Sequence, residues 1–247
     1  MMTQENYLIP ENKDAMGAAI AEYQNTRRAG RLRVLSSMFD EDEIPVQHLF
    51  RPYVGMPELE RKALDMAEGK ILDVGAGAGC HAYELQNRGK DVTAIDISTL
   101  SCDAMKARGI AQVQNINIFD KRLTGKFDTI LMLMNGTGII GKLKNMPAFL
   151  DRIKELLSDN GQLLIDSSDL KYLYENEDGT YDIDPSGPYY GEIDYQMIYR
   201  KIKGDPFDWL YVDFQTLKML AEVNGLKCEL VAEGKHFDYL AKISLHL

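Results

Sequence analysis

Between Lys70 and Ser168 the chain alternates short apolar runs with helix-patterned segments, and this alternation constrains the fold more than any other feature. The segments 80–88, 98–108 and 146–157 carry helical patterns that end at glycine or Asn-Gly. The apolar runs between and around them predict strands, at 70–74, 91–96, 111–118, 127–134 and 161–168. Repeats of strand and helix build a parallel sheet with helices on both faces. The sequence therefore predicts an α/β protein with a doubly wound sheet.

The segments that flank this repeat do not continue the alternation of strand and helix. Residues 1–56 are expected to form an N-terminal helical cap segment, with a helix over 14–28 and an acidic loop over 40–45. Residues 57–247 are expected to form the main domain, interrupted by an inserted hairpin or lid at about 170–212. A helix over 213–224 and strands over 226–233 and 239–247 follow it. The short link between the last two strands favours an antiparallel pair.

Composition narrows the classes of partner. The net charge of 28 − 38 = −10 argues against nucleic acid and anionic membranes, which require clustered Lys and Arg. Three cysteines and four histidines stand at no metal-ligand spacing, so we expect no metal site. The first residues lack the basic start and apolar stretch of a secretory signal, and no apolar run approaches the roughly 20 residues of a membrane span. These features predict a cytoplasmic protein.

The segment ILDVGAGAGC (71–80) is the strongest ligand-binding motif. Asp73 stands in the first strand, next to its last residue, and Gly75, Gly77 and Gly79 follow at alternate positions before a helix. Glycines allow a tight turn and a close approach of the ligand to the backbone. At the end of the second strand, Asp96 can accept hydrogen bonds from both hydroxyls of a ribose. The pair predicts a nucleoside site but does not choose between a nicotinamide dinucleotide and S-adenosylmethionine.

Other residues favour S-adenosylmethionine. A dinucleotide motif, G-x-G-x-x-G, would need glycine at the position of Cys80. Asp73 stands two residues before the first glycine, where a dinucleotide site usually has an apolar residue. The helix and the two strands expected at the end of the chain also favour S-adenosylmethionine.

With these residues in place, the chain resembles the class I S-adenosylmethionine-dependent methyltransferases. The resemblance covers about residues 57–168, and the terminal strands more loosely. It is carried by LDVGAGAG (72–79), VTAIDIS (92–98), KFDTILML (126–133) and LLSDNGQLLIDSS (156–168). It implies a seven-stranded sheet whose last strand is antiparallel to the others.

The resemblance also implies roles for single residues. Gly75 and Gly77 would pass under the methionyl part of the cofactor beside Asp73, Asp96 would bind the ribose, and Ile97 would pack on the adenine. Many members have an acid where this chain has Asn117, which could bind adenine or act only as a turn residue. The candidate cofactor-binding residues are Asp73, Gly75, Ala76, Gly77, Asp96, Ile97, Asn117, Ile118, Met134 and Asn135.

The methyl acceptor is expected near the ends of the fourth and fifth strands, where ligands of such sheets bind. The candidate substrate-lining residues are Tyr53, Asn135, Thr137, Ser168 and Tyr172. Transfer from a sulfonium is an in-line displacement, which needs a general base only for a poorly ionised acceptor; the candidates are Asp169, Tyr172 and His236. MNGTG (134–138) is not the Asn-Pro-Pro-Tyr motif of enzymes that methylate base amines, which favours a small-molecule acceptor.

The insertion is rich in tyrosine, with seven of the 13 tyrosines between Tyr172 and Tyr199. It could fold over the site as a lid or form the contact within a homodimer. Two other functions stay open. One is a non-catalytic S-adenosylmethionine-binding protein. The other is a nicotinamide-dependent oxidoreductase, disfavoured because no Tyr-x-x-x-Lys follows the fifth strand.

Overall fold

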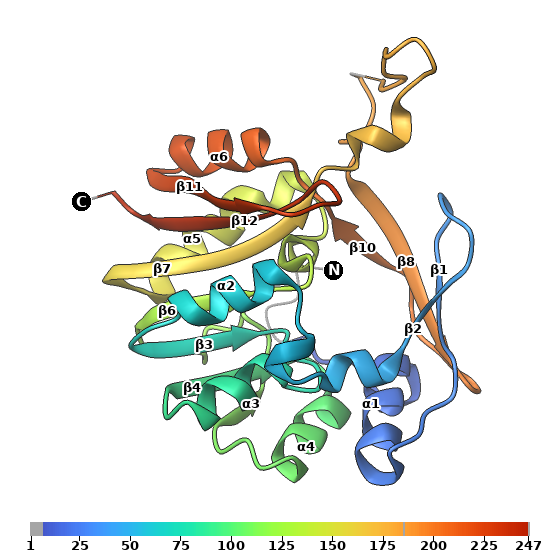
Figure 1. Cartoon of the computed structure of the whole chain (residues 1–247), viewed down its shortest axis with the longest axis vertical. Helices are drawn as coiled ribbons and strands as arrows, with labels where there is room; N and C mark the ends of the chain where they lie inside the picture. The colour runs from blue at the N-terminus through green and yellow to red at the C-terminus, as the bar shows by residue number, and fades with distance from the viewer. Residues whose placement is uncertain (1–6, 185, 247) are drawn as a thin grey trace.

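A seven-stranded sheet forms the centre of the computed structural model, which describes residues 7–184 and 186–246 (Figure 1). Its strand order is β11-β12-β7-β6-β3-β4-β5. The strands are β3 (Lys70–Val74), β4 (Asp91–Asp96), β5 (Val113–Asn115), β6 (Phe127–Met132), β7 (Leu157–Ser168), β11 (Leu226–Glu233) and β12 (Asp238–Leu245). β12 is antiparallel to both of its neighbours, whereas β3 to β7 pair in parallel. The predicted sheet is therefore confirmed.

Two strands are shorter than their apolar runs predict. The runs 111–118 and 127–134 contribute only Val113–Asn115 and Phe127–Met132 to the sheet. In both, the chain leaves the sheet at its carboxyl end, and the apolar residues beyond the strand pack against other parts of the molecule. Apolar character alone does not separate such residues from strand residues.

Five helices cover the two faces of the central sheet. α2 (Glu58–Met66), α3 (Cys80–Asn87) and α4 (Thr99–Ala107) share one apolar core with one face. α5 (Met146–Leu156) and α6 (Phe214–Val223) share another core with the opposite face. Polar side chains start two of them: Ser98 accepts from the Ser101 amide, and Asp213 from the Thr216 amide.

A second, antiparallel sheet joins the N-terminal segment to the insertion. Its order is β10-β8-β1-β2, and β9 pairs with β8 off this path. Its strands are β1 (Leu32–Leu35), β2 (Asp42–Ile44), β8 (Glu192–Tyr199), β9 (Ile202–Lys203) and β10 (Phe207–Leu210). The expectation that the acidic segment 40–45 forms a loop is wrong in part, because β2 lies within this segment. Pairing with β8 stabilises β1, since Leu32 lies opposite Tyr199 and Val34 opposite Met197.

The second sheet stands across the end of the central sheet to which β3 points, with α1 (Ala15–Thr26) below it (Figure 1). Asp14 caps α1 by accepting from the Gly17 amide and also accepts from the Ser98 hydroxyl. The Ile9 amide donates to the Ile97 carbonyl at 3.0 Å. The N-terminal segment is thus tied to the end of β4.

Short 3₁₀ helices complete the secondary structure, at Glu11–Lys13, Val46–Phe50, Tyr53–Gly55, Gly136–Ile140, Leu143–Asn145 and Leu170–Tyr174. Within the described ranges, no helix is long and apolar enough to cross a membrane. Nor do three or more His, Cys, Asp or Glu side chains gather there in a way that could hold a metal ion. Residues 1–6, on which part of the expectation about a secretory signal rests, lie outside the described residues.

Candidate functional site

A cavity of about 320 Å³ lies between the carboxyl ends of β3, β4 and β5 and the second sheet. The strand ends contribute Val74, Gly75, Ile95, Asp96, Ile97, Ile116, Asn117, Ile118 and Phe119. The N-terminal segment contributes Tyr7, Ile9, Lys13, Asp14, Ala15 and Met16. Gly138 and Ile139 follow β6, and the second sheet adds Met197, Gly204, Asp205, Phe207, Asp208 and Trp209. The cavity thus occupies the place where open α/β sheets bind ligands.

The glycine turn forms one edge of the cavity. Gly75, Gly77 and Gly79 have φ angles of +67°, +56° and +74°, a region that favours glycine. The Gly75 and Ala76 amides both donate to the Ile95 carbonyl, which holds the turn against β4. Behind it, the buried Asp73 carboxylate accepts from the Ala82 amide at 3.1 Å. Asp73 therefore organises the junction between the turn and α3.

Asp96 presents a carboxylate to the cavity. Its Oδ2 accepts from the Gly77 amide and its Oδ1 from the Ser98 amide, both at 2.8 Å. Each oxygen keeps a lone pair for a ligand hydroxyl. Burial raises the pKa of Asp96 to about 6, despite the two amide donors. This carboxylate is held in one orientation and can accept hydrogen bonds from a diol.

The wall beside Asp96 is apolar and suits a flat ring. Ile97 and Ile118 line the cavity on the β4 and β5 sides. Asn117 lies between the β5 residues of the wall, and its side-chain oxygen accepts from the Phe119 amide at 3.0 Å. This contact is the turn arrangement that the sequence left open for Asn117.

The remaining candidates for cofactor binding lie next to the cavity wall rather than in it. Asp73, Ala76 and Gly77 belong to the glycine turn and its support. Met134 and Asn135 belong to the turn after β6, four and three residues before Gly138. The structure thus brings the ten candidates to one edge of the sheet, and half of them reach the cavity surface.

The turn after β6 is held by Asp166, which is not among the residues predicted from the sequence. Met134 and Asn135 have φ angles of 68° and 58°, which cost about 1–3 kcal/mol each for residues other than glycine. The buried Asp166 carboxylate accepts from the Met134 amide at 3.0 Å and from the Gly136 amide at 2.9 Å. Burial raises the pKa of Asp166 to about 7. The signal in the sequence is a carboxylate inside an apolar strand, which rarely occurs without a specific partner.

Two of the candidate substrate-lining residues have other partners. Thr137 is fully buried, and its hydroxyl lies 2.7 Å from the Ser167 hydroxyl and 2.9 Å from the Leu210 carbonyl. It therefore joins β7 to the second sheet. Tyr53 donates to Asp65 at 2.7 Å and packs under the Arg88 guanidinium, away from the described residues that line the cavity.

The candidates for a general base also lie outside the cavity wall. Tyr172 stacks on Phe237 with ring centroids 4.5 Å apart and is 42% exposed. Asp169 caps the 3₁₀ helix at 170–174 and accepts from the Tyr190 hydroxyl at 2.8 Å. His236 is exposed. Ser168 donates to Asn135 at 2.9 Å, so it supports the turn after β6.

The second sheet supplies the wall opposite the glycine turn. Phe207 lies opposite Tyr195 in the β8–β10 pair and Trp209 opposite Ile193, so Phe207 and Trp209 share one face. Trp209 packs against the backbone of Gly138. At the rim, Lys13 pairs with Asp205 at 2.8 Å and links the N-terminal segment to the β9–β10 turn. The insertion was expected to fold over the site as a lid or to form a dimer contact. The part of it that lines the cavity includes Phe207 and Trp209, the chain's only tryptophan, and none of the seven tyrosines between Tyr172 and Tyr199.

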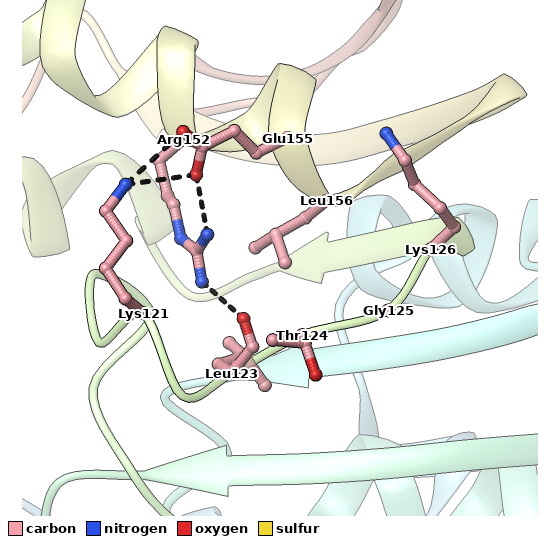
Figure 2. A pocket seen from close by; sticks show the side chains of 8 residues that line it. All are labelled: Lys121, Leu123, Thr124, Gly125, Lys126, Arg152, Glu155 and Leu156. Carbon is pink, nitrogen blue, oxygen red and sulfur yellow. Dashed lines mark hydrogen bonds and ion pairs between the residues drawn. The ribbon is translucent and has the colours of Figure 1, made fainter.

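A second hollow lies at the opposite, amino-terminal side of β6 and has no such features. It is formed by the loop 121–126 and the end of α5 (Figure 2). Arg152 donates to the Leu123 carbonyl at 2.7 Å and to Glu155 at 2.7 Å, and Lys121 pairs with Glu155 (Figure 2). Three of its charged groups, Lys121, Arg152 and Glu155, are therefore engaged with one another.

Comparisons with known proteins agree on one family. A family model described as a methyltransferase domain matches residues 47–226. The crystal structure of an S-adenosylmethionine-dependent methyltransferase from Bacteroides fragilis, in complex with S-adenosyl-L-homocysteine, is 57% identical, with a TM-score of 0.94 over 99% of this chain and 100% of that chain. An uncharacterised methyltransferase of Staphylococcus carnosus is 26% identical over 78% of this chain and 86% of its own length. The CcbJ methyltransferase of Streptomyces caelestis shares the fold, with 13% identity and a TM-score of 0.62 over 96% of this chain and 100% of that one.

Proposed function

The chain belongs to the methyltransferase domain family, and we propose that it transfers the methyl group of S-adenosylmethionine to a small-molecule acceptor. Membership confirms the resemblance inferred from the sequence. S-adenosylmethionine is its cofactor, in line with the bound S-adenosyl-L-homocysteine of the Bacteroides fragilis protein. The observation that carries the proposal is the fixed Asp96 carboxylate, which stands between the glycine turn and an apolar wall.

The residues around the cavity fit the cofactor. Asp96 would accept hydrogen bonds from the ribose hydroxyls, and Ile97 and Ile118 would enclose the adenine ring. Gly75 presents no Cβ to the ligand, so the backbone of the turn can approach it closely. When bound, the cofactor supplies an electrophilic methyl group on a sulfonium.

The protein's part in the transfer is to align the acceptor and to exclude water. Met197, Phe207 and Trp209 form an apolar wall on the side that the nucleoside residues leave open. Such a wall would hold the acceptor in line with the methyl–sulfur bond while keeping water out. Because none of the three general-base candidates lines the cavity, we propose an acceptor that is nucleophilic without deprotonation by them.

The enclosure of the cavity supports a small-molecule acceptor. Its volume of about 320 Å³ lies within the range of small-molecule sites and fits its assignment to the cofactor, and the N-terminal segment and the second sheet restrict the access of a larger acceptor to it. The net charge of −10 also favours such an acceptor over a nucleic acid. The apolar wall beyond the nucleoside residues favours an enzyme over a protein that only binds the cofactor.

Calorimetric titration tests the cofactor directly. We expect S-adenosylmethionine and S-adenosyl-L-homocysteine to bind with micromolar dissociation constants and NAD not to bind. Binding of NAD in place of these ligands would contradict the proposed function. A methyl-labelled cofactor offered with candidate small molecules then tests the transfer.

The affinity for the nucleoside is expected to rise with pH through the titration of Asp96. Its pKa of about 6 means that roughly a tenth of the carboxyl is ionised at pH 5, and the ionised form is the better acceptor for ribose hydroxyls. Binding should therefore weaken by up to about tenfold from pH 7 to pH 5. The probe is 5′-methylthioadenosine, which has no ionisable amino-acid end. Asp96→Asn should bind it more weakly and without this pH dependence, and an unchanged profile in that variant would remove Asp96 from the role.

A further inference from the structure

The turn after β6 is strained, and two residues at the end of β7 hold it in place. Met134 and Asn135 both lie in the left-handed region, with φ of 68° and 58°. Consecutive left-handed residues other than glycine persist only where the surroundings determine them, and such strain gathers at functional sites. The turn therefore requires contacts that stabilise it, and its strain indicates a functional role.

Asp166 is the principal support. Its two carboxylate oxygens accept from the amides of Met134 and Gly136, at 3.0 and 2.9 Å, and so bracket the strained residues. The side chain is buried, with 9% of its surface exposed. Ser168 adds a second contact by donating to the Asn135 side chain. Both oxygens of an ionised carboxylate are hydrogen-bond acceptors, so the Asp166 side chain can satisfy both amides at once.

In the strand order, β3 with the glycine turn lies between β6 and the strands β4 and β5, whose ends hold the proposed nucleoside residues. The turn after β6 therefore lies on the far side of the glycine turn from those residues. Asp96 ends β4, Ile118 follows β5, Gly75 follows β3, and β6 is the next strand in the sheet. Gly138 and Ile139, just after the strained turn, line the same cavity. With strands about 4.8 Å apart, a ligand whose nucleoside lies over β4 and β5 extends across β3 toward β6. The end of the cofactor remote from the adenine is its amino-acid end.

The turn also offers a group for that end. None of the described residues donates a hydrogen bond to the Met134 carbonyl oxygen, so this oxygen, next to the cavity wall, keeps the capacity to accept from a ligand's ammonium group. The position of this carbonyl depends on the left-handed conformation of Met134, which in turn depends on Asp166.

We propose that Asp166 is a positioning residue for the amino-acid end of S-adenosylmethionine. It acts through the backbone of the Met134–Gly136 turn and not by touching the nucleoside. The inference rests on the proposed function, because it assumes that the cavity holds this cofactor.

Two ligands that differ only at the amino-acid end test the inference by calorimetry. S-adenosyl-L-homocysteine carries this end, and 5′-methylthioadenosine replaces it with a methyl group. Asp166→Asn offers one acceptor and a donor in place of two acceptors, so one amide of the turn loses its partner. We expect the variant to bind S-adenosyl-L-homocysteine about tenfold more weakly and 5′-methylthioadenosine within about twofold of the unaltered protein.

Two further variants keep the test decisive. Asp96→Asn is the matched control, because it should weaken both ligands alike. Ser168→Ala removes only the contact to Asn135 and should give a smaller loss confined to S-adenosyl-L-homocysteine. It also serves as the test if Asp166→Asn does not fold. Equal loss of both ligands, or no loss of either, in folded Asp166→Asn, or in Ser168→Ala if Asp166→Asn does not fold, would overturn the inference. Failure of the unaltered protein to bind either ligand would instead contradict the proposed function.

Discussion

Replacing Gly75 with valine is expected to abolish cofactor binding while leaving the chain folded. Gly75 has a φ of +67° and lines the cavity. A Cβ at this position would lie 2.8 Å from Ile139 Cδ1 on the facing wall, so valine would occupy the passage between the nucleoside walls and the turn after β6. Because the Gly75 and Ala76 amides tie the turn to the Ile95 carbonyl, the valine side chain would have to stay in this passage, and we expect the affinity for S-adenosyl-L-homocysteine to fall by about 100-fold or more.

A glycine elsewhere separates this steric effect from backbone strain. Gly89, at the end of α3, has a φ of +74°, and a Cβ there would meet nothing within 4 Å. Gly89→Val should therefore share the cost of a left-handed valine and keep normal binding. Calorimetry with S-adenosyl-L-homocysteine measures both variants, and thermal denaturation reports whether each is folded. Similar binding by both would show that Gly75 does not face the ligand.

The central sheet could be predicted because its signals are local. Each parallel strand is a short apolar run, and Ser98 and Asp213 mark helix starts where the structure has them. The glycine motif is equally local, since its turn, strand and helix lie within ten residues (71–80).

A hairpin within the insertion was expected, but the second sheet as a whole could not be predicted in the same way because the pairing of β1 with β8 is long-range. β1 is a four-residue strand, and its partner β8 lies more than 150 residues later, so no local pattern links Leu32 to Tyr199. The cavity wall at Trp209 depends on that sheet, so the position of this wall could not be predicted either. Asp166 was overlooked for a related reason: its partners, the amides of Met134 and Gly136, belong to another strand's turn.

The contact between Trp209 and Gly138 leads to the second large effect. Gly138 is not at positive φ, so alanine there adds a methyl group without backbone strain. That methyl carbon would lie 1.8 Å from Cε2 of Trp209, closer than any real contact, and the indole must move. We expect Gly138→Ala to destabilise the chain by about 1–3 kcal/mol, as overpacking of a filled site does. For a chain of this size the melting temperature should fall by about 2–4 °C per kcal/mol.

A double-mutant cycle assigns this loss to the indole. Trp209→Ala removes the clashing group, so adding Gly138→Ala in that background should cost much less than in the unaltered protein. As Trp209 is the only tryptophan, the emission of Gly138→Ala should also shift to the red as the ring leaves its site. Equal costs in the two backgrounds would mean that the indole does not rest on Gly138. The wall formed by the second sheet would then need another anchor, because Lys13 and Asp205 pair only at its exposed rim.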